Sequence, residues 1–193
     1  MSGVLLICHA NTCRSVMAQA LLEHMLAERG VNGRIRVRSA GVSPYARDGM
    51  LASLDARIVL REVGIHLTEE SITSTDLRSH RDLLAESDLV VTMTAEQREV
   101  VATFPEAAGR TIVTLRELAG EEGDIKDPVG QGEERYRACR DEIARCLTKS
   151  IDRLLVPPAG RSGCGHSPSR CSSRCCRRRR WASRRPGCRP SES

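Results

Sequence analysis

The sequence predicts an α/β fold, in which a four-stranded parallel sheet carries helices on both faces. Short apolar runs of strand length alternate along the chain with longer segments of helical period, and this alternation favours parallel strands joined by helices. The first of these runs contains no polar residue, which is typical of a strand buried on both faces. With 193 residues, the chain is long enough for one domain with a sizeable core.

The first strand is expected at Val4–Ile7, which is apolar throughout. A helix is expected over Ser15–Arg29, because apolar residues recur there at helical spacing and Gly30 supplies a natural end. Arg34–Ala40 alternates between polar and apolar residues and predicts the second strand. Gly41–Asp48 is expected to be a loop.

Two helices are expected before the third strand. Leu51–Val63 is predicted to be helical and to end at Gly64, and Asp76–Glu86 is predicted to be a short helix. The segment between them, Ile65–Thr75, is polar and irregular, so it is assigned no element.

The second half of the body repeats the alternation. Leu89–Met93 predicts a buried third strand, and Thr94 is placed to cap a helix over Ala95–Thr103. Thr111–Leu115 predicts the fourth strand, and Glu133–Leu155 predicts a long final helix. In sheets of this kind, ligands bind outside the carboxyl ends of the strands.

Charge divides the chain into a domain, residues 1–156, and a tail, residues 157–193. The tail holds ten arginines and one acid, Glu192, which leaves 20 basic and 24 acidic side chains in the domain. Because the tail is rich in Arg, Ser, Cys and Pro and has almost no aliphatic residues, we expect it to be disordered. Its abrupt composition also fits an accident of translating GC-rich DNA.

We expect a soluble, cytoplasmic protein. Val4–Ile7 is too short for the apolar core of a signal peptide, and no run approaches the length of a membrane span. In a reducing cytosol, cysteines are catalytic or inert thiols more often than disulfides. The cysteines of the domain are Cys8, Cys13, Cys139 and Cys146.

A candidate anion-binding loop follows the first strand. Cys8 closes the strand, and Arg14 lies where a helix begins, so unpaired N–H groups and the helix dipole favour an anion there. The same field stabilises a thiolate at Cys8, to which Ser15 can donate a hydrogen bond. Asn11 tolerates the left-handed conformation of a tight loop. Arg14 can fork onto two phosphate oxygens, as lysine cannot. These features predict phosphoryl transfer to Cys8.

The spacing of Cys8 and Arg14 is weak evidence by itself. Three other pairs share it, and they are Cys139 and Arg145, Cys164 and Arg170, and Cys171 and Arg177. The first of these pairs lies within an expected helix and the others lie in the tail, whereas Cys8 stands between a strand and a helix. The alternative interpretation is a buried structural cysteine beside a surface arginine.

Residues 4–20 resemble the phosphate-binding loop of the low-molecular-weight protein tyrosine phosphatases. The signature of that family is Cys-x-Gly-Asn-x-Cys-Arg-Ser, usually followed by Pro, and here the chain reads Cys-His-Ala-Asn-Thr-Cys-Arg-Ser-Val. The resemblance extends over about residues 3–155. It includes the segments Arg38-Ser39-Ala40-Gly41, Asp88–Met93, Asp127-Pro128 and Tyr136–Ile143. It implies that fold and a protein phosphatase with a phosphocysteine intermediate; no cofactor or metal is expected.

The resemblance also implies which residues bind phosphate or shape the loop. They are His9, Ala10, Asn11, Thr12, Cys13 and Ser15. Ala10 departs from the glycine of the family, at a position where the loop approaches phosphate closely. Val16 departs from the usual proline, which costs some preorganisation of the helix start but removes no chemistry.

A single carboxylic acid can protonate the leaving group and then activate the water that hydrolyses the phosphocysteine. The resemblance implies Asp127 for this role, in the expected loop Glu121–Gly132 and directly before Pro128. A turn carboxylate is the alternative interpretation, since Asp-Pro is a common turn dipeptide. Asp124 is the second candidate acid.

The remaining cysteines of the domain bear on redox chemistry. In the family, the second loop cysteine can form a reversible disulfide with the nucleophile, and Cys13 occupies that position; simple packing of the loop is an equally open interpretation. The resemblance also offers arsenate reduction as an activity. In the family, that reaction needs further cysteines after the third strand, and Thr94–Ala108 contains none. We expect Cys139 and Cys146 to pack in the core instead.

The candidate substrate-pocket residues are Thr12, Tyr45 and Val129. Tyr45 lies where the family commonly places an aromatic wall, but Val129 follows the acid where tyrosine enzymes often carry aromatic residues. Thr12 is typical of the phosphoarginine phosphatases of the family, whereas its tyrosine enzymes more often carry an aliphatic residue. The sequence thus predicts a cysteine-dependent protein phosphatase, with phosphoarginine as the alternative to phosphotyrosine.

Two interpretations without catalysis are also open. The domain could bind phosphate without turnover, or Arg177–Arg180 and their neighbours could neutralise nucleic-acid phosphates. We expect a phosphorylated protein as the partner, no membrane, and nucleic acid only through non-specific contacts of the tail. Zinc is not expected there, because the tail lacks paired Cys-x2-Cys ligands.

Overall fold

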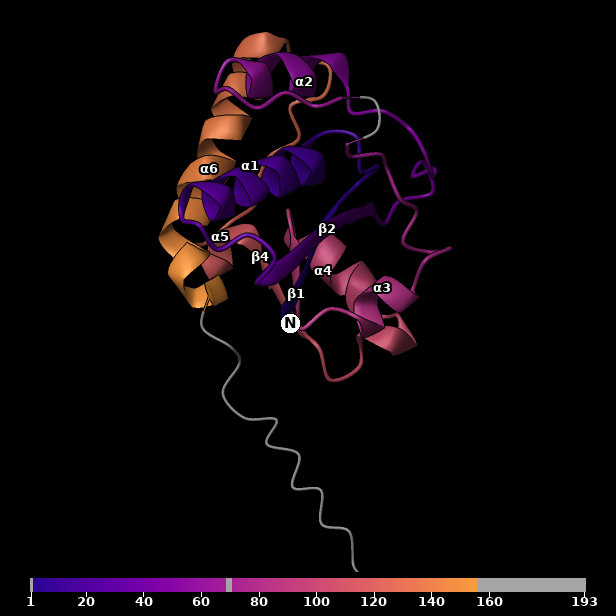
Figure 1. Ribbon diagram of the computed structural model, residues 1–193. Coiled ribbons are helices and arrows are strands. Elements are labelled where there is room, and N and C mark those ends of the chain that lie inside the picture. The colour runs from indigo at the N-terminus through magenta and orange to yellow at the C-terminus, as the bar shows by residue number, and fades with distance from the viewer. Residues whose placement is uncertain (1, 69–70, 156–193) are drawn as a thin grey trace, which may run out of the picture. The chain divides into compact units, whose positions relative to one another are not determined.

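The computed structural model describes residues 2–68 and 71–155, which form a four-stranded sheet and the helices around it (Figure 1). The strands are β1 (Ser2–Cys8), β2 (Ile35–Gly41), β3 (Leu89–Thr92) and β4 (Thr111–Thr114). They are all parallel and lie in the order β2-β1-β3-β4. The predicted sheet is therefore confirmed, with the first strand at its centre.

The register of the strands brings their carboxyl ends to one edge of the sheet. Cys8 pairs with Gly41 on β2, and Ile7 pairs with Thr92 on β3. The loop that leaves β1 after Cys8 therefore emerges between the ends of its two neighbours, where ligands bind in open parallel sheets.

Helices cover both faces of the sheet, as predicted (Figure 1). They are α1 (Arg14–Glu28), α2 (Leu54–Arg61), α3 (Asp82–Ala85), α4 (Ala95–Ala102), the 3-10 turn Pro105–Ala107, α5 (Leu115–Leu118) and α6 (Glu133–Leu155). Alternate residues of β1 serve the two layers: Leu6 packs beneath α1, α2, α5 and α6, and Leu5 packs beneath α3 and α4. The pleat of a strand sends successive side chains to opposite faces, so an apolar run fills both cores.

The helix predicted over 51–63 is shorter than expected. Leu51 forms an isolated antiparallel bridge with Thr73, which keeps its backbone extended. The helix begins only after Ser53, whose hydroxyl accepts a hydrogen bond from the N–H of Ala56 at 3.4 Å. A capping serine inside an apolar stretch thus marks the start of α2.

The helix predicted over 76–86 is also largely wrong, because only Asp82–Ala85 is helical. Asp76 instead pairs with Gly41 beyond the end of β2. In contrast, the sequence does not predict α5. Its capping box, formed by Thr114 and Glu117, begins at the last residue of β4, so no break in the sequence separates the strand from the helix.

The predicted disordered tail, residues 157–193, lies outside the described residues. Within residues 2–68 and 71–155, no helix is both long enough and apolar enough to cross a membrane.

Candidate active site

The strand–helix junction predicted to bind an anion is present. Cys8 is the last residue of β1 and Arg14 is the first residue of α1, so the intervening loop lies at the start of a helix. Both side chains are buried, with exposed fractions of 2% for Cys8 and 4% for Arg14. The helix dipole and the N–H groups of its first turn therefore act close to the sulfur.

Two hydrogen bonds are directed at the sulfur of Cys8. The hydroxyl of Ser15 donates to Sγ at 2.9 Å, and the backbone N–H of Asn11 donates to it at 3.3 Å. Donors of this kind stabilise negative charge on an acceptor. The environment suits a thiolate.

Asn11 holds the loop in shape. Its φ of 57° lies in the left-handed region, as its residue type allowed. Its Nδ2 donates to the hydroxyls of Ser15 at 2.8 Å and Ser39 at 2.9 Å, and its Oδ1 accepts from the N–H of Thr75 at 2.8 Å. One buried carboxamide thus ties together α1, β2 and the segment that follows α2.

The end of β2 packs directly against the loop. A Cβ atom added at Gly41 would lie 2.8 Å from the carbonyl carbon of Ala10 and 2.9 Å from the carbonyl oxygen of His9. Such distances are too short for any side chain. Glycine at position 41 is therefore required for the backbone of β2 to approach the loop.

The guanidinium of Arg14 joins the loop to the segment after β4. Its Nη1 donates to the carbonyl of Ile125 at 3.0 Å, and its Nη2 donates to Oδ2 of Asp127 at 2.5 Å. Its Nε is buried without a partner, one of two such side-chain atoms among residues 2–68 and 71–155. A buried unpaired donor is costly, and an oxyanion held in the loop would satisfy it.

The structure brings the predicted acid, Asp127, to the same place. Its side chain is 43% exposed, and its Oδ1 accepts from the N–H of Val129 at 3.3 Å. The N–H of Ile125 donates to the carbonyl of Met93 at 2.9 Å, which fixes this segment at the end of β3. The second candidate, Asp124, instead accepts from the N–H of Ala95 at the start of α4, at 2.8 Å.

Cys13 lies buried beside α6. Burial is the main cause that raises the pKa of its thiol far above the ordinary value, so Cys13 stays protonated at neutral pH. Its neighbours on α6 are Tyr136 and Cys139, and burial raises the pKa of each to about 12. Tyr136, which the sequence does not mark as a site residue, has its hydroxyl beside Cys13 and Ser53.

The predicted pocket residues belong to the loop, contact it or neighbour the acid. The rings of His9 and Tyr45 pack with centroids 5.8 Å apart, and Tyr45 is 73% exposed. Val129 is 60% exposed and follows the acid. Thr12 is half-buried, and its carbonyl accepts from the N–H of Ser53 at 2.8 Å. An exposed aromatic side chain thus contacts the loop, and an exposed aliphatic one lies next to the acid.

Sequence reasoning also missed Gln19 and Thr75. Gln19 accepts a hydrogen bond from the Ser39 hydroxyl at 2.7 Å, and Thr75 holds Asn11 through its backbone. No local pattern signals a contact made by a backbone N–H. Within the described ranges, no three His, Cys, Asp or Glu side chains are grouped so that they could hold a metal ion.

Comparison with known proteins gives a consistent result. Residues 3–155 match the family model described as low molecular weight phosphotyrosine protein phosphatase. A protein-arginine-phosphatase of Geobacillus stearothermophilus is 38% identical over 152 residues, which cover 78% of this chain and 95% of that protein.

Two solved structures extend the comparison. A low molecular weight protein tyrosine phosphatase from T. tengcongensis is 33% identical, with a TM-score of 0.70 over 80% of this chain and 100% of that one. A YwlE arginine phosphatase mutant with a phosphorylated active-site serine is 32% identical, with a TM-score of 0.68 over 80% of this chain and 99% of that one.

Proposed function

Because the chain belongs to the low molecular weight phosphotyrosine protein phosphatase family, we propose that it removes phosphate from protein side chains through a phosphocysteine at Cys8. Its membership and its relatives make it a protein phosphatase. The observation that carries the proposed mechanism is the convergence of Cys8, Arg14 and Asp127 at one edge of the sheet.

In the first step, the thiolate of Cys8 attacks phosphorus. Arg14 and the loop N–H groups hold the phosphoryl oxygens while the S–P bond forms. The bond from phosphorus to the leaving atom breaks, and Asp127 gives that atom its proton. The side chain of the substrate leaves without phosphate.

In the second step, the Asp127 carboxylate takes a proton from water, which attacks phosphorus. The S–P bond breaks, inorganic phosphate forms, and the Cys8 thiolate is restored. A related arginine phosphatase with a phosphorylated active-site serine supports a covalent intermediate of this kind.

We further propose that protein phosphoarginine is the preferred substrate. Thr12 is a residue of the phosphate loop, and its hydroxyl can accept a hydrogen bond from a guanidinium. Val129, beside the acid, provides no aromatic wall. The 38% identical relative is named a protein-arginine-phosphatase, which supports the same assignment.

Phosphotyrosine is the second candidate, and one observation favours it. The exposed Tyr45 packs against His9 of the phosphate loop, where it could stack on a phenyl ring. The similar protein from T. tengcongensis is named a tyrosine phosphatase.

Matched peptides that differ only in phosphoarginine or phosphotyrosine test the proposal. The wild-type protein should release phosphate from both, with a higher kcat/KM for phosphoarginine. Cys8→Ser should abolish turnover and keep phosphate affinity, whereas Cys146→Ser, a buried cysteine of α6, should leave turnover unchanged. Turnover by Cys8→Ser would overturn the mechanism, and a higher kcat/KM for phosphotyrosine would overturn the substrate preference.

We place this activity in the cytoplasm. A catalytic thiol needs a reducing compartment, where free cysteines persist. Cys8, Cys13, Cys139 and Cys146 are all free thiols in the structure.

A further inference from the structure

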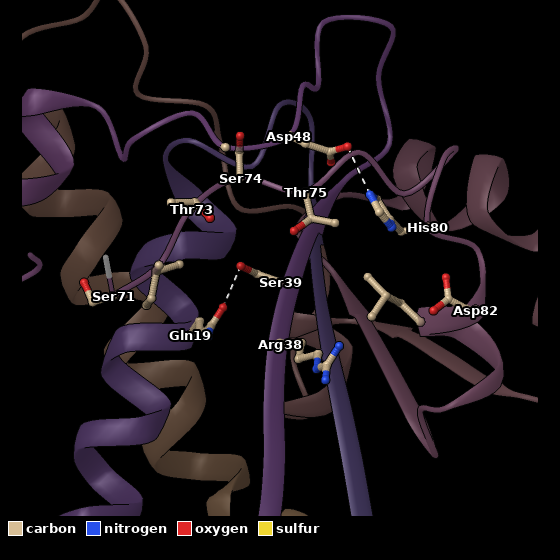
Figure 2. Close-up of a pocket in the computed structure, with 13 residues that line it drawn as sticks. Gln19, Arg38, Ser39, Asp48, Ser71, Thr73, Ser74, Thr75, His80 and Asp82 are labelled. Atoms are coloured by element: carbon tan, nitrogen blue, oxygen red, sulfur yellow. Dashed lines mark hydrogen bonds and ion pairs between the residues drawn. The ribbon is translucent and has the colours of Figure 1, made fainter. Parts of the chain in front are cut away.

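A cavity separate from the candidate active site lies beside the sheet edge formed by β2 (Figure 2). Its volume of about 430 Å³ falls within the usual range of small-molecule sites, roughly 300–1,000 Å³. Cys8, Arg14 and Asp127 are not part of its lining. Its walls come from α1, β2, the segment 71–75 and the start of α3, and most of the side chains are polar.

Two charged side chains of the lining, Arg38 and Asp82, are exposed to solvent and lack protein partners among the described residues. Arg38 projects from β2, and its guanidinium has no hydrogen bond or ion pair within the described part of the chain. Asp82, the first residue of α3, likewise has no side-chain partner among the described residues. Figure 2 shows these two side chains on the β2 and α3 sides of the cavity. Asp48, in contrast, is hydrogen-bonded to His80 at 3.0 Å.

The charges in the lining define the charge of a complementary ligand. Apart from His80, the charged side chains of the lining are Arg38, Asp48 and Asp82, which together carry one negative charge. A ligand with one anionic group and two cationic groups would match it. A free amino acid with a cationic side chain has this pattern, because it carries a carboxylate, an ammonium and a side-chain cation.

The cavity shares its wall with the network that shapes the phosphate loop. Ser39, in the wall, accepts a hydrogen bond from Asn11 at 2.9 Å. It also donates one to Gln19 at 2.7 Å (Figure 2). Thr75, also in the wall, donates its N–H to Asn11 at 2.8 Å. A ligand that restrains these residues would restrain Asn11, and Asn11 donates its own N–H to Cys8.

We propose that this cavity binds a free cationic amino acid, with its carboxylate on Arg38 and its side-chain cation at Asp82, and that this binding raises the affinity of the phosphate loop for oxyanions. The ligand acts through Ser39 and Thr75, which hold Asn11 from the cavity side. Coupling between two binding sites is reciprocal, so an oxyanion in the loop tightens binding in the cavity by the same factor.

Calorimetry with L-arginine tests the binding. Orthovanadate fills the phosphate loop in these titrations, so the amino acid cannot bind there. Arg38→Gln should weaken binding by about tenfold or more, since a charge-assisted contact is lost. Arg36→Gln is the matched control, because Arg36 lies two residues away on the same strand and pairs with Glu86 at 3.0 Å; it should bind L-arginine like the wild type.

Two further ligands test the contacts of the carboxylate and of the side-chain cation separately. Agmatine lacks the carboxylate and should lose the dependence on Arg38, and citrulline lacks the side-chain charge and should lose the dependence on Asp82→Asn. The proposal is overturned if wild-type protein shows no saturable binding of L-arginine, or if Arg36→Gln weakens it as much as Arg38→Gln does.

Direct titration of orthophosphate tests the coupling. Saturating L-arginine should lower the Kd of phosphate by about fivefold in the wild type and leave it unchanged in Arg38→Gln. An unchanged Kd in the wild type would overturn the coupling. Because phosphate binding is measured without turnover, this result does not depend on the proposed phosphatase substrate.

Discussion

Arg14 and Asp127, 113 residues apart in the sequence, are joined by a hydrogen bond of 2.5 Å from Nη2 to Oδ2. Arg14 is the proposed ligand of the phosphoryl group, and Asp127 is the proposed proton donor to the leaving atom. The same guanidinium thus contacts both partners of the proposed reaction. An oxyanion bound in the loop would share this guanidinium with Asp127. Binding of the substrate and the position of the acid would therefore be linked.

Asp127→Asn tests the role of the acid. Asparagine keeps an oxygen for Arg14 but cannot donate the carboxylic proton, so kcat should fall by about 10²–10⁴-fold with little change in KM. Asp124→Asn is the control, since Asp124 is bonded to the start of α4. Steady-state kinetics on both variants decide the assignment, and an equal loss in Asp124→Asn would contradict it.

Thr12→Ile tests the preference for phosphoarginine. Removal of the hydroxyl takes away a hydrogen-bond acceptor and adds apolar surface, so the ratio of phosphotyrosine to phosphoarginine kcat/KM should rise by about tenfold. Thr148→Ile makes the same exchange on the exposed side of α6 and should leave the ratio unchanged. If the ratio is unchanged in Thr12→Ile, then Thr12 does not determine the preference for phosphoarginine.

Gly41→Ala tests the close approach of β2 to the loop. The added methyl would meet the backbone of Ala10 and His9, so it should both destabilise the fold by about 1–3 kcal/mol and lower kcat/KM by about tenfold or more. Gly3→Ala is also crowded, with a carbonyl oxygen of Glu86 2.9 Å away, but it lies at the opposite end of β1 from the loop. Denaturant titrations should show a loss in both variants, and kinetics a loss in Gly41→Ala only.

Cys13→Ser tests protection against oxidation. Peroxide converts Cys8 to a sulfenic acid, which can condense with the Cys13 thiol to form a disulfide and release water. The wild type and Cys146→Ser should regain activity with dithiothreitol, whereas Cys13→Ser should be lost to the sulfinic acid. Full recovery of Cys13→Ser would show that Cys13 only packs the loop.

Glu121 should make stability depend on pH. Hydrogen bonds from Arg145 and then Lys149 lower the pKa of Glu121 from 4.5 to about 2. The folded state thus binds the proton more weakly than the unfolded chain, so the stabilisation is present above about pH 4.5 and is lost as the pH falls toward 2. The difference in Tm between wild type and Glu121→Gln should shrink between pH 7 and pH 3. Glu122→Gln, an exposed neighbour, should match the wild type at every pH.

The sequence was sufficient for the features that local patterns encode. The apolar run before Cys8 and the helical period after Ser15 predicted the junction of β1 and α1, and the residue type of Asn11 predicted its left-handed φ. Asp127 could be named from its dipeptide and the resemblance. That it meets Arg14 depends on the strand order, which no local pattern states.

Other features could not be predicted because they arise between distant segments. The contacts of Gln19 and Thr75 join residues 20 and 64 positions away from their partners. The sequence from Asp76 onward favours a helix, yet Asp76 pairs with Gly41 instead, and this tertiary contact overrides the local preference. Tertiary contacts decide such short elements, whereas longer periodic ones follow their own sequence.

The order in which the chain is made has a consequence for its activity. Cys8, the proposed nucleophile, lies in β1, the first of the described strands along the chain, but β1 is flanked on both sides only after β3, which comes much later in the sequence, has paired with it. Asp127 is made more than a hundred residues after Arg14. By the proposed mechanism, a nascent chain would therefore carry the Cys8 thiol before Asp127 exists, and activity would begin only when nearly all of the domain has been synthesised and its long-range strand pairings have formed.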